Sequence, residues 1–300
     1  MKILITGANG LLGQYFVRQA IAKGYVVTGT GRGPGKLIAA ALDGYSYFPV
    51  DITDGPALRA LIVSEKPTVI VHAAAMTQVD QCENDKQECY NVNVTATRFL
   101  IDAAKEIGAR LVYISTDFIF DGESGPYNES AEPSPVNYYG STKLVAEKSV
   151  MESGLQWAVA RTVLVYGLVS GSGRKNIISF VKESLEQATP IRMVTDQYRT
   201  PTFVQDLATG VLLIIEKNAT GIFHLSGDRL VTPYEMAVAT AKFFGLDENL
   251  IGKTTSAELN QPAVRPPKTG FIIDKAKREL GFAPVSFETG LKNIFLDPAT

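Results

Sequence analysis

Short apolar runs alternate with longer segments of helical periodicity along the first half of this 300-residue chain. In segment 12–21, for example, apolar residues recur at helical spacing. Strands this apolar suit a parallel sheet that is covered on both faces, and right-handed crossovers leave few other topologies. The sequence therefore predicts an α/β fold with a doubly wound parallel sheet. The predicted strands are residues 2–6, 25–30, 45–50, 68–73, 110–115 and 156–161.

Three glycines stand at the junction between the first predicted strand and the first predicted helix, where residues 7–13 read GANGLLG. We expect Gly7 to turn the chain out of the strand, Gly10 to let the backbone approach a bound pyrophosphate, and Gly13 to let the helix pack closely. The helix N-terminus would offer free N–H groups to the phosphates. A tight turn without a ligand is the alternative, and the surrounding β-α units favour a dinucleotide site.

The loop after the second predicted strand indicates which dinucleotide would bind. An acidic residue there would bind the ribose hydroxyls, but residues 30–36 read TGRGPGK. The cation Arg32 suits a 2′-phosphate, so NADP(H) is preferred and NAD(H) stays the alternative. A solvated loop arginine is the competing interpretation. Small residues follow the fourth strand and would let a dinucleotide lie across its end, unless they simply pack in the core: Ala73, Ala74 and Ala75.

Residues 137–148 read NYYGSTKLVAEK and predict a helix. Tyr139 and Lys143 are four residues apart, so they lie on one helical face. An unperturbed phenol titrates near pKa ~10, and a neighbouring ammonium lowers that pKa, so the pair suits a proton donor. Tyr138 is the rival, but its fourth neighbour, Thr142, carries no charge. An incidental Tyr and Lys on a solvated helix is the alternative interpretation.

Ser115 and Thr116 follow the fifth predicted strand, at the edge where a nicotinamide would lie. A hydroxyl there can hydrogen-bond a substrate carbonyl oxygen and support the charge that develops on it. A hydroxyl that caps a turn is the alternative. The glycine turn, this hydroxyl and the Tyr-x-x-x-Lys pair occur in the order and on the elements that hydride transfer requires.

The composition narrows the function further. A net charge of −2 does not suggest binding to nucleic acid or to an acidic membrane surface. No apolar run is long enough to span a bilayer and no leader segment is evident, so we expect a cytoplasmic protein. Cys82 and Cys89 are expected on one helix as reduced packing residues, and no metal is assigned. His72 and His224 are expected to be packed or hydrogen-bonded.

These motifs together resemble the extended short-chain dehydrogenase/reductase family, and within it the dTDP-4-dehydrorhamnose reductase branch. The resemblance covers nearly the whole chain. It is carried by GANGLLG (7–13), VHAAAMTQVDQCE (71–83), NVNVTAT (91–97), ISTDFIFDG (114–122), YYGSTKLVAE (138–147), ARTVLVYG (160–167), DQYRTPT (196–202) and RPPKTGFIIDKAKRELGF (265–282).

The resemblance implies NADPH-dependent reduction of the keto group of a nucleotide-linked deoxysugar, foremost a dTDP-sugar. Its catalytic set would be Thr116, Tyr139 and Lys143. Its cofactor contacts would be Gly7, Gly10, Leu11, Leu12, Gly13, Arg32, Asp51, Ile52, Ala73, Ala74, Ala75, Asn93, Ser115, Tyr139, Lys143 and Val163. Its substrate contacts would be Thr116, Tyr166, Arg199, Thr200 and, more weakly, Arg265, with Arg161 near the nicotinamide or the substrate.

Two departures and two alternatives accompany this resemblance. A tryptophan is common before the VYG turn of the branch, but Val163 and Leu164 stand there, which leaves the particular sugar open. The regulatory subunit of methionine adenosyltransferase shares the scaffold, binds NADP and a partner chain, and is the first alternative. A nucleotide-sugar epimerase is the second. Homodimers are common in the family, whereas its magnesium-linked contacts cannot be placed on this sequence.

We expect residues 1–165 to form an NAD(P)-binding Rossmann-type domain, to which segment 203–230 returns. Residues 166–300 would form mainly a smaller C-terminal substrate-binding lobe at the carboxyl edge of the sheet. The patterns in this half predict a loop at 170–176, helices at 176–187, 203–217 and 232–245, and strands at 191–195 and 221–227.

Overall fold

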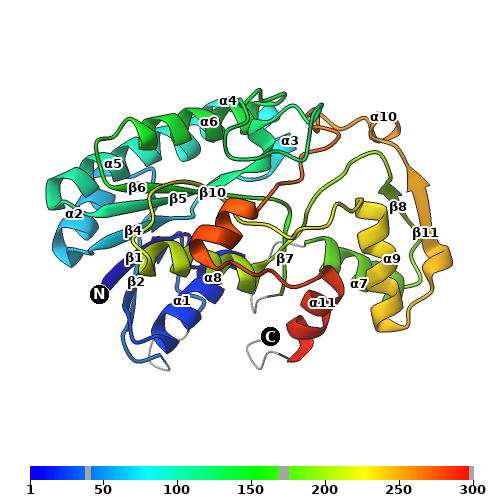
Figure 1. Ribbon diagram of the computed structural model, residues 1–300, viewed down its shortest axis with the longest axis horizontal. Helices are drawn as coiled ribbons and strands as arrows, with labels where there is room; N and C mark the ends of the chain where they lie inside the picture. Colours follow the sequence, from blue (N-terminus) through cyan, green and yellow to red (C-terminus); the bar gives the residue numbers. More distant parts are fainter. Residues whose placement is uncertain (38–41, 169–175, 297–300) are drawn as a thin grey trace.

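The computed structural model describes residues 1–37, 42–168 and 176–296. One parallel sheet runs through it, with seven strands in the order β10-β6-β5-β4-β1-β2-β3. The chain order reverses between β1 and β4, so the crossovers on the two sides of this point place helices on opposite faces (Figure 1). The predicted doubly wound parallel sheet is confirmed. Its strands are β1 (Lys2–Thr6), β2 (Val26–Gly31), β3 (Tyr45–Pro49), β4 (Val69–His72), β5 (Arg110–Thr116), β6 (Trp157–Thr162) and β10 (Gly221–His224).

Successive side chains of β1 enter different cores, which explains why the strand is apolar throughout. Ile3 and Ile5 are fully buried in one core, and Leu4 is fully buried in the other. The first core lies between the sheet and helices α1 (Leu11–Ala22) and α8 (Val204–Glu216). The second lies under α2 (Gly55–Glu65), α5 (Ala96–Ile107) and α6 (Tyr138–Met151) (Figure 1).

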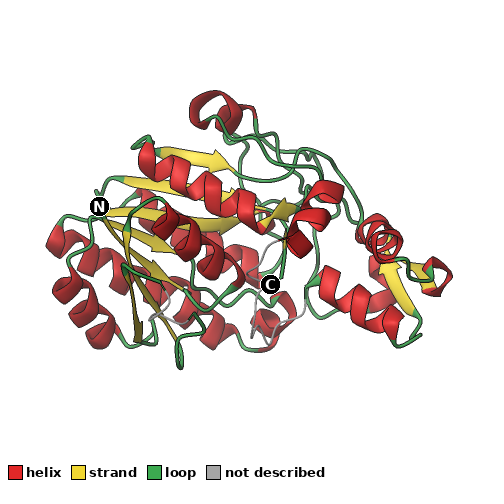
Figure 2. Cartoon of the chain, turned by 90° about the horizontal axis from the view of Figure 1, so that it is seen from below, coloured by secondary structure: helices red, strands yellow, loops and turns green. Residues whose placement is uncertain are grey.

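A second, smaller layer lies beside the main sheet (Figure 2). It pairs β8 (Ile191–Val194) with β11 (Ile251–Thr254) in parallel and packs α7 (Ile177–Glu186) and α9 (Pro233–Phe244) against them. A short pair, β7 (Val165–Tyr166) and β9 (Thr202–Phe203), leads toward this layer. The remaining C-terminal elements are η4 (Glu248–Leu250), α10 (Ser256–Leu259), η5 (Ala276–Leu280) and α11 (Phe287–Leu296).

Helix ends follow the chemistry of the local sequence. In α9, the Thr232 hydroxyl accepts the Glu235 N–H while the Glu235 carboxylate accepts the Thr232 N–H, and Pro233 occupies the first turn. The helix ends at Phe244 and is capped by Gly245, whose φ of 63° suits glycine. The predicted helices at 176–187, 203–217 and 232–245 are thus confirmed to within a few residues. Of the predicted loop 170–176, only Asn176, which caps α7, lies within the described residues.

The segment that carries the cysteines differs from the prediction. Cys82 lies in α3 (Val79–Asn84) and Cys89 in α4 (Lys86–Tyr90), so the expected single helix is wrong. Asp85 breaks it because its side chain accepts the Glu88 N–H and starts a new helix. Both cysteines are buried and free. Over the described ranges, no group of metal-binding side chains gathers, and no helix is long and apolar enough to cross a membrane.

Candidate active site

A cleft of about 970 Å³ follows the carboxyl ends of the sheet strands. Gly7, Gly31, Ala73, Thr116 and Thr162, which end or follow five different strands, all line it. The cleft therefore lies where the strand order reverses, the place where open α/β sheets bind their ligands.

The glycine turn forms one end of this cleft. Gly7 has φ +74°, and a Cβ on Gly13 would lie 2.2 Å from the Gly7 carbonyl oxygen, so both positions require glycine. Gly10 differs, because a Cβ there would meet only the Gly7 oxygen, at 3.2 Å. Gly10 is the N-cap residue of α1, and because it has no side chain it does not use the free N–H groups of the first turn. The turn thus leaves its outer face open and presents N–H groups of the first turn of α1 to a ligand.

Asn9 organises the loop after β2, although the sequence analysis did not single it out. Its Nδ2 donates to the carbonyl oxygens of Arg32 (3.2 Å) and Pro34 (3.0 Å), and its Oδ1 accepts the Lys36 N–H (2.9 Å). Arg32 and Lys36 are exposed and both line the cleft. The loop therefore offers two cations to a ligand, where the sequence predicted only Arg32. The role of Asn9 could have been expected from its position inside the glycine turn.

The other expected cofactor contacts divide into lining residues and supporting residues. Asn93, in η2 (Asn91–Thr95), is buried behind the wall, and its amide accepts the Met76 N–H (2.8 Å) and donates to the Met76 oxygen (3.1 Å). Asn93 thereby holds the chain that follows β4. Val163 is fully buried, while its neighbour Leu164 lines the cleft with φ +34°. The lining set also contains Leu11, Leu12, Asp51, Ile52, Ala74 and Ala75.

The expected catalytic side chains lie together because α6 approaches the end of β5 closely. A Cβ on Gly140 would lie 2.0 Å from the Phe118 oxygen, so only glycine allows this approach. Thr116, Tyr139 and Lys143 all line the cleft. The Lys143 Nζ donates to the Ile114 oxygen (2.8 Å) and lies 4.1 Å from the centroid of the Tyr113 ring.

Burial dominates the electrostatics of this group. It raises the pKa of Tyr139, a shift that Asp117 adds to and a hydrogen bond with Thr116 opposes. It also lowers the pKa of Lys143 to about 7, against the opposing charge of Glu147. The prediction that Lys143 lowers the pKa of Tyr139 is wrong for this arrangement, because burial is the largest influence on that pKa and raises it, while the Lys143 amine hydrogen-bonds to the Ile114 carbonyl. A raised pKa keeps the Tyr139 phenol protonated at neutral pH.

Ser115 provides a further polar atom in the cleft. Its side-chain oxygen is buried and has no hydrogen-bond partner among the residues that the structure describes. Buried polar groups in native proteins almost always find a partner, so an orphaned hydroxyl on a cleft wall fits a ligand that completes it. This atom, the open face at Gly10 and the cations Arg32 and Lys36 together fit a phosphorylated dinucleotide.

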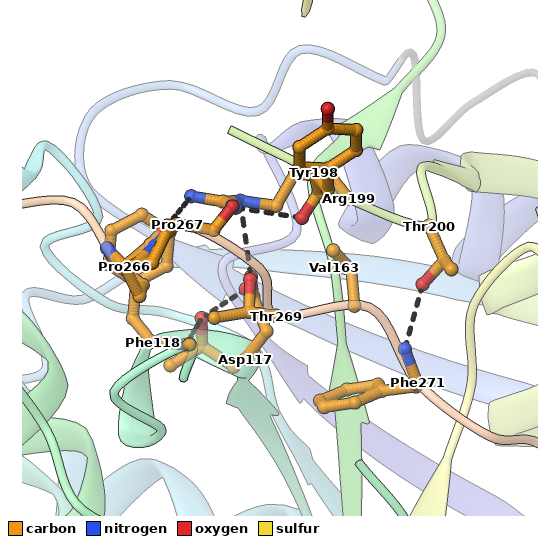
Figure 3. Close-up of polar contacts among 12 residues, drawn as sticks. Asp117, Phe118, Val163, Tyr198, Arg199, Thr200, Pro266, Pro267, Thr269 and Phe271 are labelled. Atoms are coloured by element: carbon orange, nitrogen blue, oxygen red, sulfur yellow. Dashed lines mark hydrogen bonds and ion pairs between the residues drawn. The ribbon is translucent and has the colours of Figure 1, made fainter. Parts of the chain in front are cut away.

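Arg199 lies behind the cleft wall with its guanidinium already engaged (Figure 3). Only 3% of the residue is exposed. Its Nη2 donates to the Pro266 oxygen (2.7 Å), its Nη1 donates to the Tyr198 oxygen (2.8 Å), and its Nε lies 3.7 Å from the Asp117 Oδ2. Burial lowers the pKa of Arg199, while Asp117 raises it. Contact between Arg199 and a diphosphate stays a prediction.

The remaining expected substrate residues are also engaged within the protein. The Thr200 hydroxyl accepts the Phe271 N–H at 3.1 Å (Figure 3). Arg265 binds both oxygens of Asp80, at 2.8 and 2.7 Å. Tyr166 is buried against Phe203 and Phe287, and Arg161 forms a buried ion pair with Glu147. None of these four lines the cleft in the described part of the chain, so their direct contact with substrate stays a prediction.

Comparison with known proteins finds relatives with two kinds of name, each matched over most of the chain. Methionine adenosyltransferase 2 subunit beta of Bos taurus is 35% identical over 262 residues, covering 85% of this chain and 76% of that protein. The dTDP-4-dehydrorhamnose reductase of Streptomyces griseus is 32% identical over 293 residues, covering 94% and 88%. The solved structure of dTDP-4-dehydrorhamnose reductase from Bacillus anthracis in complex with NADP matches with a TM-score of 0.84 and 28% identity, covering 98% of each chain.

The match to a protein family is equally extensive. The model of the RmlD substrate binding domain family spans residues 1–299, which is nearly the whole chain. This span includes the glycine turn, the Tyr139–Lys143 helix and the C-terminal elements up to α11. The chain therefore belongs to the RmlD substrate binding domain family.

Proposed function

We propose that the protein is an NADPH-dependent reductase of a nucleotide-linked keto sugar, with the C4 ketone of a dTDP-linked 6-deoxysugar as its substrate. The observation that carries this proposal is one cleft wall shared by the glycine turn, Thr116, Tyr139 and Lys143. The family membership and the relatives named as dTDP-4-dehydrorhamnose reductases support the same reaction.

The cofactor half of the cleft fits a phosphorylated dinucleotide. The turn at Gly7 and Gly10 and the N-terminus of α1 would hold the pyrophosphate, and Arg32 and Lys36 would hold the 2′-phosphate. The orphaned Ser115 hydroxyl would complete its hydrogen bonding to the same ligand. When bound, NADPH supplies the hydride that reduces the ketone.

The residues of the chain would handle the proton. Tyr139 keeps its phenolic proton at neutral pH because burial raises its pKa, and it would donate that proton to the oxygen of the former ketone. Lys143 lies on the same face of α6, and its low pKa lets it exchange a proton near neutrality. Thr116 would orient the Tyr139 hydroxyl, with which it shares a hydrogen bond.

The test is a reductase assay with purified protein. A dTDP-4-keto-6-deoxyhexose should cause loss of the NADPH absorbance, and the rate with NADPH should exceed the rate with NADH because of Arg32 and Lys36. A dTDP-sugar that carries a C4 hydroxyl in place of the C4 ketone serves as the control. Absence of NADPH consumption with this ketosugar and with related nucleotide ketosugars would contradict the proposal.

A regulatory role beside methionine adenosyltransferase is the second candidate, favoured by the 35% identity to the subunit beta of Bos taurus. It predicts a stable complex with a methionine adenosyltransferase catalytic chain and no turnover of ketosugars. Co-purification with that catalytic chain, combined with the reductase assay, separates the two functions. The presence of Thr116, Tyr139 and Lys143 in one cleft favours catalysis.

We further propose that the protein is cytoplasmic and forms a homodimer. Three large apolar side chains on α5 and α6 are more than a third exposed, namely Phe99, Val145 and Met151, which supports an interface on this helical layer. Sedimentation analysis that found only monomers at high protein concentration would contradict the dimer.

A further inference from the structure

A buried carboxylate stands directly beside the expected catalytic threonine. Asp117, in η3 (Asp117–Ile119), is 1% exposed and lines the cleft next to Thr116. Its two oxygens have different partners. The Oδ1 accepts a hydrogen bond from the Thr116 hydroxyl at 3.1 Å, and the Oδ2 accepts a hydrogen bond from the Thr269 hydroxyl and faces the Arg199 guanidinium (Figure 3).

This division determines where the Thr116 hydroxyl points. A threonine hydroxyl has one proton to donate, and here it donates to Asp117. The oxygen of Thr116 also accepts the Phe118 N–H at 3.2 Å. With both contacts made, the oxygen keeps one lone pair for a hydrogen bond from Tyr139 or from a ligand. The orientation of the Asp117 carboxylate thus decides from which direction the Thr116 oxygen can accept a further hydrogen bond.

The partners of Oδ2 come from the C-terminal half of the chain. Thr269 is fully buried and belongs to residues 263–271, which we call the strap. The strap is anchored at several places around the site: Ala263 N donates to Asp80, Asn137 donates to the Val264 oxygen, Arg199 donates to the Pro266 and Pro267 oxygens, and Tyr127 N donates to the Gly270 oxygen. The strap therefore connects the C-terminal half to the elements that carry Thr116 and Tyr139.

Stability alone is a poor explanation of this buried charge. Removing a carboxylate and a guanidinium from water is costly, and such pairs often add nothing beyond what apolar packing would provide. Burial raises the pKa of Asp117, and Arg199, Thr269 and Thr116 all act against that shift, so three groups favour the ionised carboxylate. The hydrogen bonds hold the Asp117 carboxylate as an oriented acceptor at the reaction edge of the sheet.

We propose that Asp117 is a positioning residue for Thr116, held in orientation by Arg199 and by the strap residue Thr269. The C-terminal half of the chain would thereby set the hydroxyl geometry at the site of reduction. This role rests on the proposed reductase function. It differs from a direct substrate contact, because Thr269 does not line the cleft.

The test compares two substitutions at Thr269. Thr269→Val keeps the shape but removes the hydroxyl, and we expect kcat to fall about tenfold, as for loss of a hydrogen bond to a charged group. KM for the ketosugar and Kd for NADPH should stay within about twofold. Thr269→Ser retains the hydroxyl and should restore kcat to within about threefold of wild type.

A control variant and a second substitution complete the experiment. Thr240 is also fully buried, and its hydroxyl donates within α9 to the Met236 oxygen at 2.7 Å. Thr240→Val should therefore leave kcat unchanged. Asp117→Asn removes the charge and should lower kcat at least as much as Thr269→Val, with NADPH Kd preserved, and it replaces Thr269→Val if that variant does not fold.

The outcomes separate this role from the proposed function. An active wild type with an equally active Thr269→Val variant would contradict the positioning role alone. Equal losses in Thr269→Val and Thr269→Ser, or a change confined to KM, would contradict it as well. A wild type that reduces no ketosugar would contradict the proposed function and this role with it.

Discussion

Tyr139 is the residue whose environment matters most for the proposed chemistry. Burial pushes both Tyr139 and Lys143 toward their uncharged forms, since it raises the pKa of the phenol and lowers the pKa of the amine. The two groups thus become a protonated donor and an amine that titrates near neutrality. This differs from a phenolate stabilised by an ammonium, which the helical spacing alone suggested.

Substitution of Tyr139 tests the proton-donor role. Tyr139→Phe removes only the hydroxyl, so kcat should fall by about 10²–10⁴-fold while Kd for NADPH and the melting temperature stay near wild type. Steady-state kinetics and a cofactor titration measure this. Tyr138→Phe, at the neighbouring half-buried tyrosine, is the matched control and should keep wild-type kcat. Wild-type turnover in Tyr139→Phe would remove this residue from the mechanism.

At the scale of elements, the β1–α1 turn combines two different requirements for glycine. Gly13 serves packing, because its Cβ would overlap the Gly7 oxygen, whereas a Cβ on Gly10 would make a single tight contact, 3.2 Å from the same oxygen. Gly140 in α6 is required for packing as Gly13 is, because it lets the helix approach the Phe118 backbone. Close approach of backbones therefore positions both the cofactor end and the catalytic end of the cleft.

Two alanine variants separate these requirements. Gly13→Ala should lose about 1–3 kcal/mol of stability because the overlap forces α1 away from β1. Gly10→Ala should leave the melting temperature nearly unchanged but weaken NADPH binding by about tenfold, since its methyl would occupy the space that a pyrophosphate approaches. Thermal unfolding and cofactor titration of both proteins give the comparison. Unchanged NADPH affinity in Gly10→Ala would argue against a phosphate at this turn.

At the scale of the whole molecule, the two histidines of the chain are buried in different parts of the structure. His72 lies between the Thr6 and Thr97 hydroxyls, and His224 stacks on Phe271. Burial lowers the pKa of each to about 3. Unfolding would restore an ordinary histidine pKa near ~6.5, so the unfolded chain binds more protons below that pH.

Stability should therefore decrease as the pH falls from about 6.5 toward 3, by up to about 1.4 kcal/mol per histidine and pH unit. Asp206 offsets part of this loss of stability below pH 6. Burial raises its pKa to about 6, so its protonation below that pH favours the folded state. Urea unfolding at about pH 7.5, 6 and 5 measures the slope, and His224→Gln should reduce it by more than half, because Asp206 already offsets part of the contribution of the two histidines. Stability that did not change over this range would contradict neutral, buried histidines.

Much of the fold could be predicted because its signals are local. The six strands predicted in the first half appear within one or two residues, since most of them are short apolar runs that are buried on both faces, and only the edge strand β3 is largely uncovered. The glycine turn and the spacing of Tyr139 and Lys143 also lie within single elements. The break at Asp85 was missed because a capping carboxylate competes with helical periodicity, and periodicity alone does not reveal it.

The sequence by itself determined the doubly wound sheet, the dinucleotide-type turn and the family, because these depend on spacing along the chain. Only the tertiary structure decided what surrounds each polar side chain. In the folded chain, Arg199 faces Asp117 and the strap, Tyr166 is buried in the core, and Lys143 donates a hydrogen bond to the Ile114 carbonyl. The physical reason is that a charge or hydroxyl takes its properties from partners brought near by folding, which can lie far away in the sequence.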